Sequence, residues 1–333
     1  MMPDSAKTAS QALMLGSRLT KRLKHLKKWA RRVGVEAFRL YDRDIPEIPL
    51  ALDYYGSAVS GSLYKRPYQV EDEEERLWLS VMSQTIADAL TIPPERIFLK
   101  TRERQRGKAQ YSKLPGQGVT LDTREGDLVF RVNLSNYLDT GLFLDARKAR
   151  AFVKTQAAGK RVLNLFCYTG AFSVYAASGG ASTVDSVDLS KTYLDWAMLN
   201  LSLNGFEARR LTSRHAMDVG RFLEEARQRR LVWDLIVLDP PSFSNSKKMQ
   251  GTFDIRRDHR ALIRQCIGLL APGGSLFFSV NARGFRLKPA EFYGLSIQDL
   301  SDILIDEDFQ GKKMPSRYLV KTQYAGKDTI DRS

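Results

Sequence analysis

Cysteine and histidine are scarce in this chain, which has two cysteines and three histidines among 333 residues. Two cysteines cannot build a disulfide framework, and the scattered histidines form no zinc motif with them. No metal site is therefore expected. The low cysteine content also fits a reducing compartment, so we predict a cytoplasmic protein.

Long apolar runs are lacking as well. Residues Met1–Lys7 contain no apolar core of the kind a signal peptide needs, and no later run approaches the roughly 18 apolar residues of a membrane span. We expect nothing in the chain to cross a membrane. The length instead predicts about two domains, and a hydrophobic fraction of 43% is sufficient for a folded core.

Basic residues are present in excess. The chain carries 52 Lys and Arg against 38 Asp and Glu, which gives a formal charge of +14. The sequence pI is near 9.7. Such a balance favours a polyanionic partner and predicts RNA binding.

Part of this charge predicts an amphipathic helix from about Gln11 to Val33. Apolar residues recur on one face at helical spacing, at Leu19, Leu23, Leu26, Trp29, Ala30 and Val33. Cations crowd the rest of the surface, at Lys21, Arg22, Lys24, Lys27, Lys28, Arg31 and Arg32. We favour a helix that docks by its apolar face. Its basic face could also meet phosphates, whereas a role at a membrane surface fits the rest of the chain poorly.

Three segments are predicted along the chain. Residues 1–35 form the basic helical arm, residues 36–130 a small α+β domain in contact with RNA, and residues 131–333 an α/β domain. In the middle segment we expect strands at 37–41, 50–55, 62–64, 97–101 and 119–121 and a helix at 71–90. The cationic stretch from Lys100 through Arg102 and Arg104 to Lys113 is either an RNA-binding loop or a solvent-facing hairpin.

The last segment contains an apolar strand, Asp234–Leu238, that ends in Asp239, Pro240 and Pro241. Two consecutive prolines cannot donate ladder hydrogen bonds, so they end the strand and stiffen the turn. A Pro-Pro turn that closes an ordinary strand is the more common explanation of such a string. If the turn is functional, Asp239, Pro240, Ser242 and Phe243 are the candidate catalytic residues.

Upstream, Arg161–Ala177 predicts a strand, a tight turn and a helix, which is typical of a nucleotide site. The next strand ends in Asp188, about 20 residues beyond the turn, where doubly wound folds place the residue that binds ribose hydroxyls. A third strand, 210–216, precedes Asp218, which could accept a hydrogen bond from an adenine amino group. Each acid alone is more commonly a helix N-cap or a surface charge. Together with Asp239 they converge on the carboxyl edge of a parallel sheet, where ligands bind.

The same turn argues against a dinucleotide. Binding a pyrophosphate needs G-x-G-x-x-G, and only Gly170 is present here. S-adenosylmethionine has no phosphate, so one glycine and side-chain carboxylates are sufficient for it.

The motifs resemble a known family. The strings 99–105, 136–147, 164–170, 239–248 and 281–286 closely resemble the C-terminal half of the bifunctional RlmKL family, and the chain from about residue 131 is similar to class I S-adenosylmethionine-dependent methyltransferases. Ala146 and Cys167 depart from that pattern. The resemblance implies a doubly wound, mostly parallel, seven-stranded sheet, the cofactor S-adenosylmethionine, and methylation of large-subunit 23S ribosomal RNA at guanine N7. The other half of that family, an N2-guanine methyltransferase with an RNA-binding module, is not found here, and a separate partner could replace it.

The resemblance also implies site residues. Those expected at the cofactor are Phe143, Asp145, Arg147, Asn164, Phe166, Tyr168, Thr169, Gly170, Asp188, Leu189, Asp218 and Asp239. Those expected to contact RNA are Lys100, Arg102, Arg104, Lys247, Lys248, Asn281 and Arg283. The polar stretch 242–251 could be a lid or an ordinary surface loop. After a strand at 275–280 we expect a helix near 289–304 and a final hairpin of strands at 309–314 and 318–324.

The chemistry distinguishes the alternatives. Cytosine C5 methylation needs a cysteine thiolate, and Cys167 and Cys266 are in the wrong places. Enzymes that methylate exocyclic amines commonly have an aromatic directly after Pro-Pro, where Ser242 stands here. Guanine N7 carries an exposed lone pair and needs no general base, so alignment by Asp239, Phe243, Asn281 and Arg283 is sufficient. Guanine-N2 and adenine-N6 methylation remain the runner-up, an RNA-binding assembly factor is the non-enzyme alternative, and an oxidoreductase is disfavoured.

Overall fold

The computed structural model describes residues 5–64, 70–102, 118–208, 211–244 and 252–322. The chain forms two compact units, which we call unit 1 (residues 1–144 and Glu307–Gln310) and unit 2 (Asp145–Asp306 and residues from Gly311 onward). No helix in the described ranges is long and apolar enough to span a bilayer.

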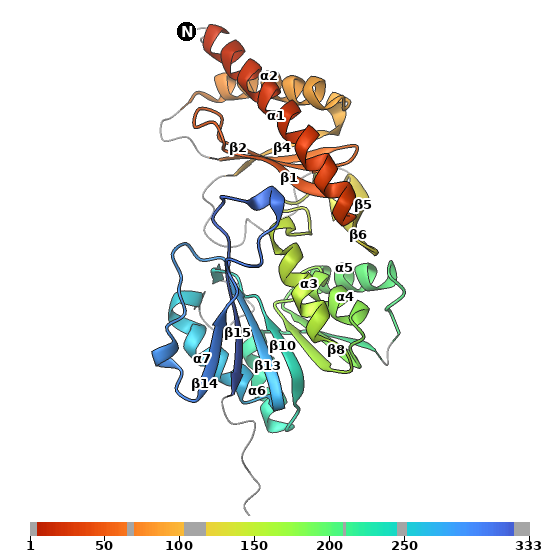
Figure 1. Cartoon of the computed structure of the whole chain (residues 1–333), viewed down its shortest axis with the longest axis vertical. Coiled ribbons are helices and arrows are strands. Elements are labelled where there is room, and N and C mark those ends of the chain that lie inside the picture. The colour runs from red at the N-terminus through yellow and green to blue at the C-terminus, as the bar shows by residue number, and fades with distance from the viewer. Residues whose placement is uncertain (1–4, 65–69, 103–117, 209–210, 245–251, 323–333) are drawn as a thin grey trace, which may run out of the picture. The chain divides into compact units, whose positions relative to one another are not determined.

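Unit 1 is built on a four-stranded sheet in the order β1-β2-β3-β4 (Figure 1). β3 and β4 are parallel and helix α2 connects them, whereas the other pairs are antiparallel. A separate hairpin, β5-β6, follows. The elements are α1 (Ser5–Val33), β1 (Ala37–Asp42), β2 (Leu50–Tyr55), β3 (Val59–Tyr64), α2 (Asp72–Leu90), η1 (Pro94–Arg96), β4 (Ile97–Arg102), β5 (Thr120–Glu125) and β6 (Leu128–Asn133).

Helix α1 docks on this unit by its apolar face, as the sequence pattern predicts. Leu15, Leu19 and Leu26 are fully buried, and Trp29 is 6% exposed. They join the core formed with β1, β2 and α2. Val33, predicted to continue the apolar face, is instead 42% exposed because the helix ends there.

Unit 2 is a doubly wound α/β unit. Its seven-stranded sheet has the order β14-β15-β13-β10-β7-β8-β9, in which β15 is antiparallel to both β13 and β14 and the other neighbouring pairs are parallel. The fold class inferred from the sequence is confirmed. The elements are η3 (Leu144–Ala146, which begins in unit 1), α3 (Arg147–Gln156), β7 (Arg161–Leu165), α4 (Ala171–Ser178), β8 (Thr183–Asp188), α5 (Lys191–Ser202), β9 (Thr212–Ala216), α6 (Val219–Gln228), β10 (Trp233–Leu238), β11 (Phe243–Ser244), β12 (Phe253–Asp254), α7 (Ile255–Ile267), β13 (Leu270–Val280), η4 (Pro289–Glu291), β14 (Leu295–Asp299) and β15 (Ser316–Thr322).

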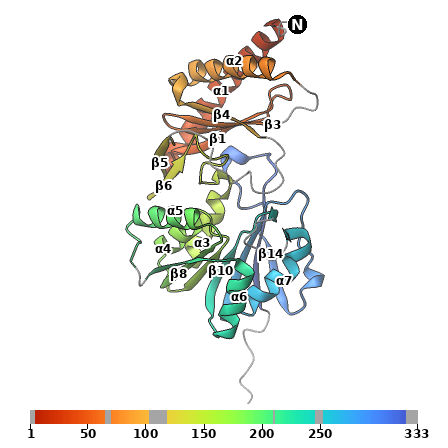
Figure 2. The same cartoon turned by 180° about the vertical axis from the view of Figure 1, so that it is seen from behind.

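Helices cover both faces of this sheet (Figures 1 and 2). Rings from α3 and α4 contact Phe277 on one face. On the other face, residues of α6 and α7 form a core with the neighbouring residues Leu276 and Phe278. Because successive side chains of a strand point to opposite faces, β13 is buried on both sides, as a central strand of a sheet covered by helices on both faces requires.

Two predictions near the C-terminus are wrong. The predicted helix at 289–304 is a short 3-10 turn followed by strand β14, which pairs with β15. Gly294 has φ +76° directly before the strand, a conformation that interrupts a helix. The predicted strand at 309–314 is also absent, since the final hairpin is β14-β15.

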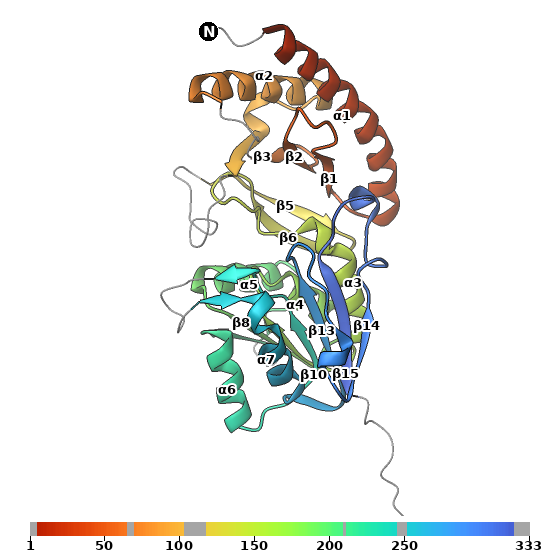
Figure 3. The same cartoon turned by 90° about the vertical axis from the view of Figure 1, so that its left-hand side faces the viewer.

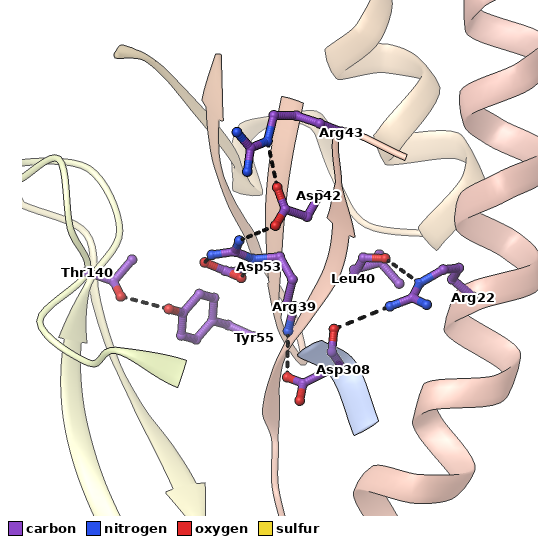
Figure 4. Close-up of polar contacts among 9 residues, drawn as sticks. All are labelled: Arg22, Arg39, Leu40, Asp42, Arg43, Asp53, Tyr55, Thr140 and Asp308. Atoms are coloured by element: carbon purple, nitrogen blue, oxygen red, sulfur yellow. Dashed lines mark hydrogen bonds and ion pairs between the residues drawn. The ribbon is translucent and has the colours of Figure 1, made fainter. Parts of the chain in front are cut away.

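The segment Glu307–Gln310 belongs to unit 1 although unit 2 surrounds it in sequence. Asp308 is fully buried, and its carboxylate accepts a hydrogen bond from the Arg39 amide at 2.9 Å (Figure 4). The Arg39 side chain pairs with Asp53. This long-range insertion has no signature in the sequence pattern.

Candidate active site at the carboxyl edge of the parallel sheet

Strand register in unit 2 gathers the predicted acids at one edge. Leu238 pairs with Leu165 and with Phe278, and Leu165 pairs with Val187. Phe278, Leu238, Leu165 and Val187 thus lie side by side on adjacent strands. The residues that follow them, Ser279, Asp239, Phe166 and Asp188, therefore succeed one another along the carboxyl edge of the sheet. Neighbouring strands lie about 4.8 Å apart, which places Asp239 and Asp188 roughly 10 Å from each other. Strand order reverses between β7 and β10, and such a switch point is where ligands bind.

Asp239 has a strongly perturbed carboxyl, and burial also raises the pKa of Asp188. The pKa of Asp239 is raised to about 6, mainly by burial and in smaller part by the nearby Asp145. A hydrogen bond with Ser279 and the charges of Arg317 and Arg150 lower the pKa without cancelling the effect of burial. A carboxylate that is short of positive charge favours a cationic ligand, because the ligand stabilises the ionised form.

Two buried arginines interact electrostatically with this carboxyl, and the sequence analysis did not predict them. Arg317 is 0% exposed and donates to the carbonyls of Asp145 at 2.7 Å and Leu304 at 2.6 Å. Burial lowers its pKa, while Asp145 and Asp239 raise it. Arg150 is 1% exposed, and its guanidinium lies over the Tyr175 ring. A signal was present, because an arginine inside an apolar strand such as β15 needs buried acceptors.

The turn after β7 is held in an uncommon conformation. Phe166 has φ 56° and Tyr168 has φ 51°, values in the left-handed region that few side chains adopt. The Tyr168 amide donates to the Asp188 carboxylate at 3.0 Å, and the Asn200 side chain donates to the Thr169 carbonyl at 2.8 Å. Neighbouring elements therefore fix this turn from two sides.

Gly170 is required at the end of this turn by packing. Its φ is +74°, and a Cβ there would lie 2.6 Å from Cβ of Ala197 in α5. We expect Gly170→Ala to lower the free energy of unfolding by about 2 kcal/mol or more, since it combines backbone strain with a clash. Urea denaturation measures this. Gly205→Ala is the matched control, because Gly205 has φ +73° but no atom within 4 Å of the added Cβ. Equal losses in both variants would contradict the packing argument.

The remaining predicted cofactor residues fall into three groups. Phe166, Tyr168, Leu189 and Asp145 are half-buried at or beside the edge. Others have structural contacts: Asn164 is 1% exposed and donates to Ser173, Arg147 is 6% exposed and pairs with Asp306, and Asp218 caps α6 by accepting from the Arg221 amide. Phe143, 45% exposed, and the buried Thr140 belong to unit 1, where Thr140 bonds Tyr55.

The segment after Asp239 presents one aromatic. The Ser242 hydroxyl donates to the carbonyl of Asn281 at 2.6 Å, which ties this turn to the end of β13. Phe243 is 44% exposed in the short β11-β12 ladder. Asn281 and Arg283 are exposed, and the Arg283 carbonyl accepts from Arg256. Ser242 and Phe243 thus follow β10, and Asn281 and Arg283 follow its neighbour β13.

Neither cysteine can serve as a nucleophile in this form. Cys167 and Cys266 are both buried, and burial raises the pKa of each thiol. A thiol with a raised pKa holds little thiolate at neutral pH. This agrees with the argument against cytosine C5 chemistry. Within the described ranges, no cluster of three or more His, Cys, Asp or Glu could hold a metal ion.

One residue predicted to contact RNA is mostly buried. Lys100 is only 8% exposed and donates to the Tyr137 carbonyl, because strand β4 turns its side chain inward. The Arg102 side chain, Arg104, Lys247 and Lys248 lie outside the described residues, as does most of the predicted lid at 242–251.

Comparison with known proteins identifies the family. A family model described as S-adenosylmethionine-dependent methyltransferase matches residues 39–289, which is more than half of the chain. The chain belongs to this family. Its cofactor is S-adenosylmethionine, and the residues present suit it: the edge has carboxylates for a cationic ligand and no glycine-rich phosphate loop.

Relatives of this methyltransferase support the assignment. It is 48% identical to ribosomal RNA large subunit methyltransferase K of Neisseria meningitidis over 90% of this chain and 84% of that protein. It is 44% identical to ribosomal RNA large subunit methyltransferase K/L of Pseudomonas aeruginosa over 92% of this chain but 42% of that protein. The chain therefore spans less than half the length of this K/L relative.

Solved structures agree. A methyltransferase in complex with SAH superposes with a TM-score of 0.73 at 25% identity, over 93% of this methyltransferase and 82% of that chain. A SAM-dependent methyltransferase from Agrobacterium tumefaciens has a TM-score of 0.58 at 21% identity, over 82% of this chain and 87% of that one, and supports the fold alone.

Proposed function

We propose that this methyltransferase acts on large-subunit 23S ribosomal RNA and transfers the methyl group to guanine N7. The name shared by its relatives supports the RNA substrate. The observation that carries the choice of atom is the Ser242 hydroxyl, which takes the place of the aromatic of amine methyltransferases and is engaged with a backbone carbonyl at 2.6 Å. Exocyclic amines must lose a proton during methylation, whereas N7 has a free lone pair.

The bound cofactor supplies an electrophilic methyl group on a sulfonium. In the proposal, Asp239 orients the cationic groups at the edge, and its carboxylate offsets positive charge that develops on the guanine ring. Asp188, Asp145, Phe166, Tyr168 and Leu189 shape the cofactor side. No residue needs to remove a proton from N7. Alignment is the main task of the protein and can supply up to roughly 7–11 kcal/mol of barrier reduction.

The strained turn suits this task. Phe166 and Tyr168 keep left-handed backbone conformations only because β8 and α5 hold the turn in place. A site built on a fixed backbone loses little conformational entropy when substrates bind. Asp239 is equally fixed, because Pro240 and Pro241 follow it and Ser279 holds its carboxyl.

We assign Phe243 to the guanine side. It is 44% exposed and directly follows the rigid turn, so a base can stack on it. Phe243→Ala should raise the KM for RNA about 10-fold or more, because one base stack contributes about 1–3 kcal/mol, while the Kd for S-adenosylmethionine changes less than twofold. Steady-state kinetics and calorimetry measure the two constants. Phe243→Tyr is the control and should retain affinity for RNA. A variant that loses cofactor affinity and keeps its RNA KM would remove Phe243 from the base side.

Nucleoside analysis tests the proposal. The protein is incubated with methyl-labelled S-adenosylmethionine and unmodified large-subunit RNA, and the RNA is digested to nucleosides. We expect the label in N7-methylguanosine. Label in N2-methylguanosine or N6-methyladenosine would support the amine alternatives and reject N7, and no label in RNA would reject the substrate class.

A further inference from the structure

Helix α1 carries charge of one sign only. Between Ser5 and Val33 it has nine Lys and Arg residues and no Asp or Glu. Exposed helices are usually stabilised by opposite charges at i and i+4, and like charges at that spacing are destabilising. Lys24 and Lys28 are four residues apart, as are Lys28 and Arg32. The cations of α1 therefore repel one another, and the helix has no acidic residue that could offset this repulsion.

The eight cations of α1 from Arg18 onward divide into two sets. Arg18 pairs with Asp44 at 2.9 Å, Arg22 donates to the Leu40 carbonyl at 3.0 Å (Figure 4), and Lys27 lies over the Tyr54 ring. A second set is exposed and makes no ion pair with any residue that the structure describes. We call it the α1 stripe: Lys21, Lys24, Lys28, Arg31 and Arg32.

The α1 stripe is one continuous row. At about 100° and 1.5 Å per residue, its members fall within an arc of about 100° and extend over about 17 Å. Figure 3 shows the sheet and α2 of unit 1 to one side of α1. At the border of the row, His25 lies 3.0 Å from Glu307, and this acid pairs with none of the stripe residues. The row presents cations at intervals comparable with those of phosphates along a nucleic-acid strand.

Exposure to solvent does not by itself explain why the stripe cations lack acidic partners, because exposed arginines elsewhere in the protein have them. On helix α6, Arg221 pairs with Glu225 and Arg227 with Glu224, each at 2.8 Å. Arg31 and Arg32 are favourable next to the negative end of the α1 dipole. The helix dipole does not stabilise Lys21, Lys24 and Lys28 in this way, because all three lie more than one turn before the C-terminal end of α1.

The apolar face of α1 excludes one class of partner. Basic amphipathic helices bind a bilayer by inserting their apolar face. Here Leu15, Leu19 and Leu26 are fully buried in the core of unit 1, so that face is already occupied. The α1 stripe therefore presents positive charge, but the helix has no free apolar face to insert into a bilayer. This combination suits a rigid polyanion.

We infer that the α1 stripe is a second RNA-binding surface, separate from the edge of unit 2, that holds backbone phosphates without reading sequence. The inference rests on the proposed RNA substrate. Phosphate contacts supply affinity and strong salt dependence, whereas chemistry occurs at the sheet edge. The stripe therefore contributes to RNA capture and leaves the transfer step unchanged.

Removing two stripe charges tests the inference. The double variant Lys24→Ala, Lys28→Ala is compared with Arg221→Ala, Arg227→Ala, which loses the same net charge from paired sites. At 0.1 M salt, the stripe variant should bind large-subunit RNA about 10-fold or more weakly, and the slope of log affinity against log salt should fall by about 1.4–1.8. Its kcat at saturating RNA, its cofactor Kd and its thermal midpoint should match the wild type. The α6 variant should bind like the wild type.

Three results would overturn the inference. One is unchanged RNA affinity and salt slope in the stripe variant, and another is an equal loss in both double variants, which would indicate net charge alone. The third is loss of binding to phosphatidylserine vesicles with RNA binding intact. Because binding is read without methylation, a methylated nucleoside other than N7-methylguanosine would reject the proposed atom and leave this test standing.

Discussion

Asp239→Asn is expected to reduce methyl transfer by about 100-fold or more while leaving the fold intact. The substitution keeps the shape of the side chain and removes the charge that faces the cationic cofactor. Losses of this size are typical when one electrostatic or aligning group is removed. Single-turnover rates measure the transfer step, and calorimetry measures cofactor binding. A wild-type rate for the variant would remove Asp239 from the mechanism.

The same variant has a second expected effect, on the pH dependence of stability. The pKa of Asp239 is raised to about 6 in the folded protein, above the unfolded value of about 3.9. The folded state therefore binds more protons between these values, so the wild type loses stability as pH rises from about 4 to about 6 and then stays level. The asparagine variant lacks this loss.

Relative to the wild type, Asp239→Asn should thus gain about 1–3 kcal/mol of unfolding free energy between pH 4 and pH 7. Urea denaturation at the two pH values gives this difference directly. Asp234→Asn is the contrasting control, because Arg161 holds the pKa of Asp234 below its usual value, so the stability that this pair adds changes mainly below about pH 4 and the variant should show no such gain between pH 4 and pH 7. A constant gap between Asp239→Asn and the wild type would contradict the raised pKa.

Arg317→Met is expected to lower the free energy of unfolding by about 3–5 kcal/mol. The guanidinium is fully buried, and without it the carbonyls of Asp145 and Leu304 lose their donor. Asp239 also loses a compensating charge, and an uncompensated buried charge has a cost of this order. Equilibrium urea denaturation measures the change.

Two further variants sharpen this test. Arg317→Lys keeps the charge but cannot span both carbonyls, so we expect an intermediate loss. Arg221→Met removes an exposed pair on α6 and should change stability by less than about 1 kcal/mol. If Arg317→Met is as stable as Arg221→Met, the buried network contributes little to the fold.

Much of unit 2 follows from short-range sequence signals. The period-two and period-3.6 patterns place β7, α4, β8 and β10, and the acids after the strands locate the carboxyl edge. The hairpin at the C-terminus was misplaced because Leu295–Asp299 is only half-buried and has weak alternation. Pairing with β15, which is distant in sequence, decides its conformation.

Long-range contacts account for most of the rest. No local pattern shows that Asp308 is buried beside Arg39, or that Arg317 lies behind Asp239. Lys100 was assigned to RNA because its neighbours are cationic, but β4 turns its side chain inward. Asn164 and Gly170 were predicted at the cofactor from their motif alone, and the sequence did not show that Asn164 bonds Ser173 or that Gly170 packs against Ala197.

The central claim is that the methyl group reaches guanine N7 without proton removal. It is tested most directly with large-subunit RNA transcribed with 7-deazaguanosine in place of guanosine, which replaces N7 by a C–H group and keeps the exocyclic amine. We predict that this RNA still binds, by filter retention, and accepts no methyl group from labelled S-adenosylmethionine, while ordinary transcript is methylated in parallel. Methylation of the deaza transcript at the ordinary rate would contradict the account.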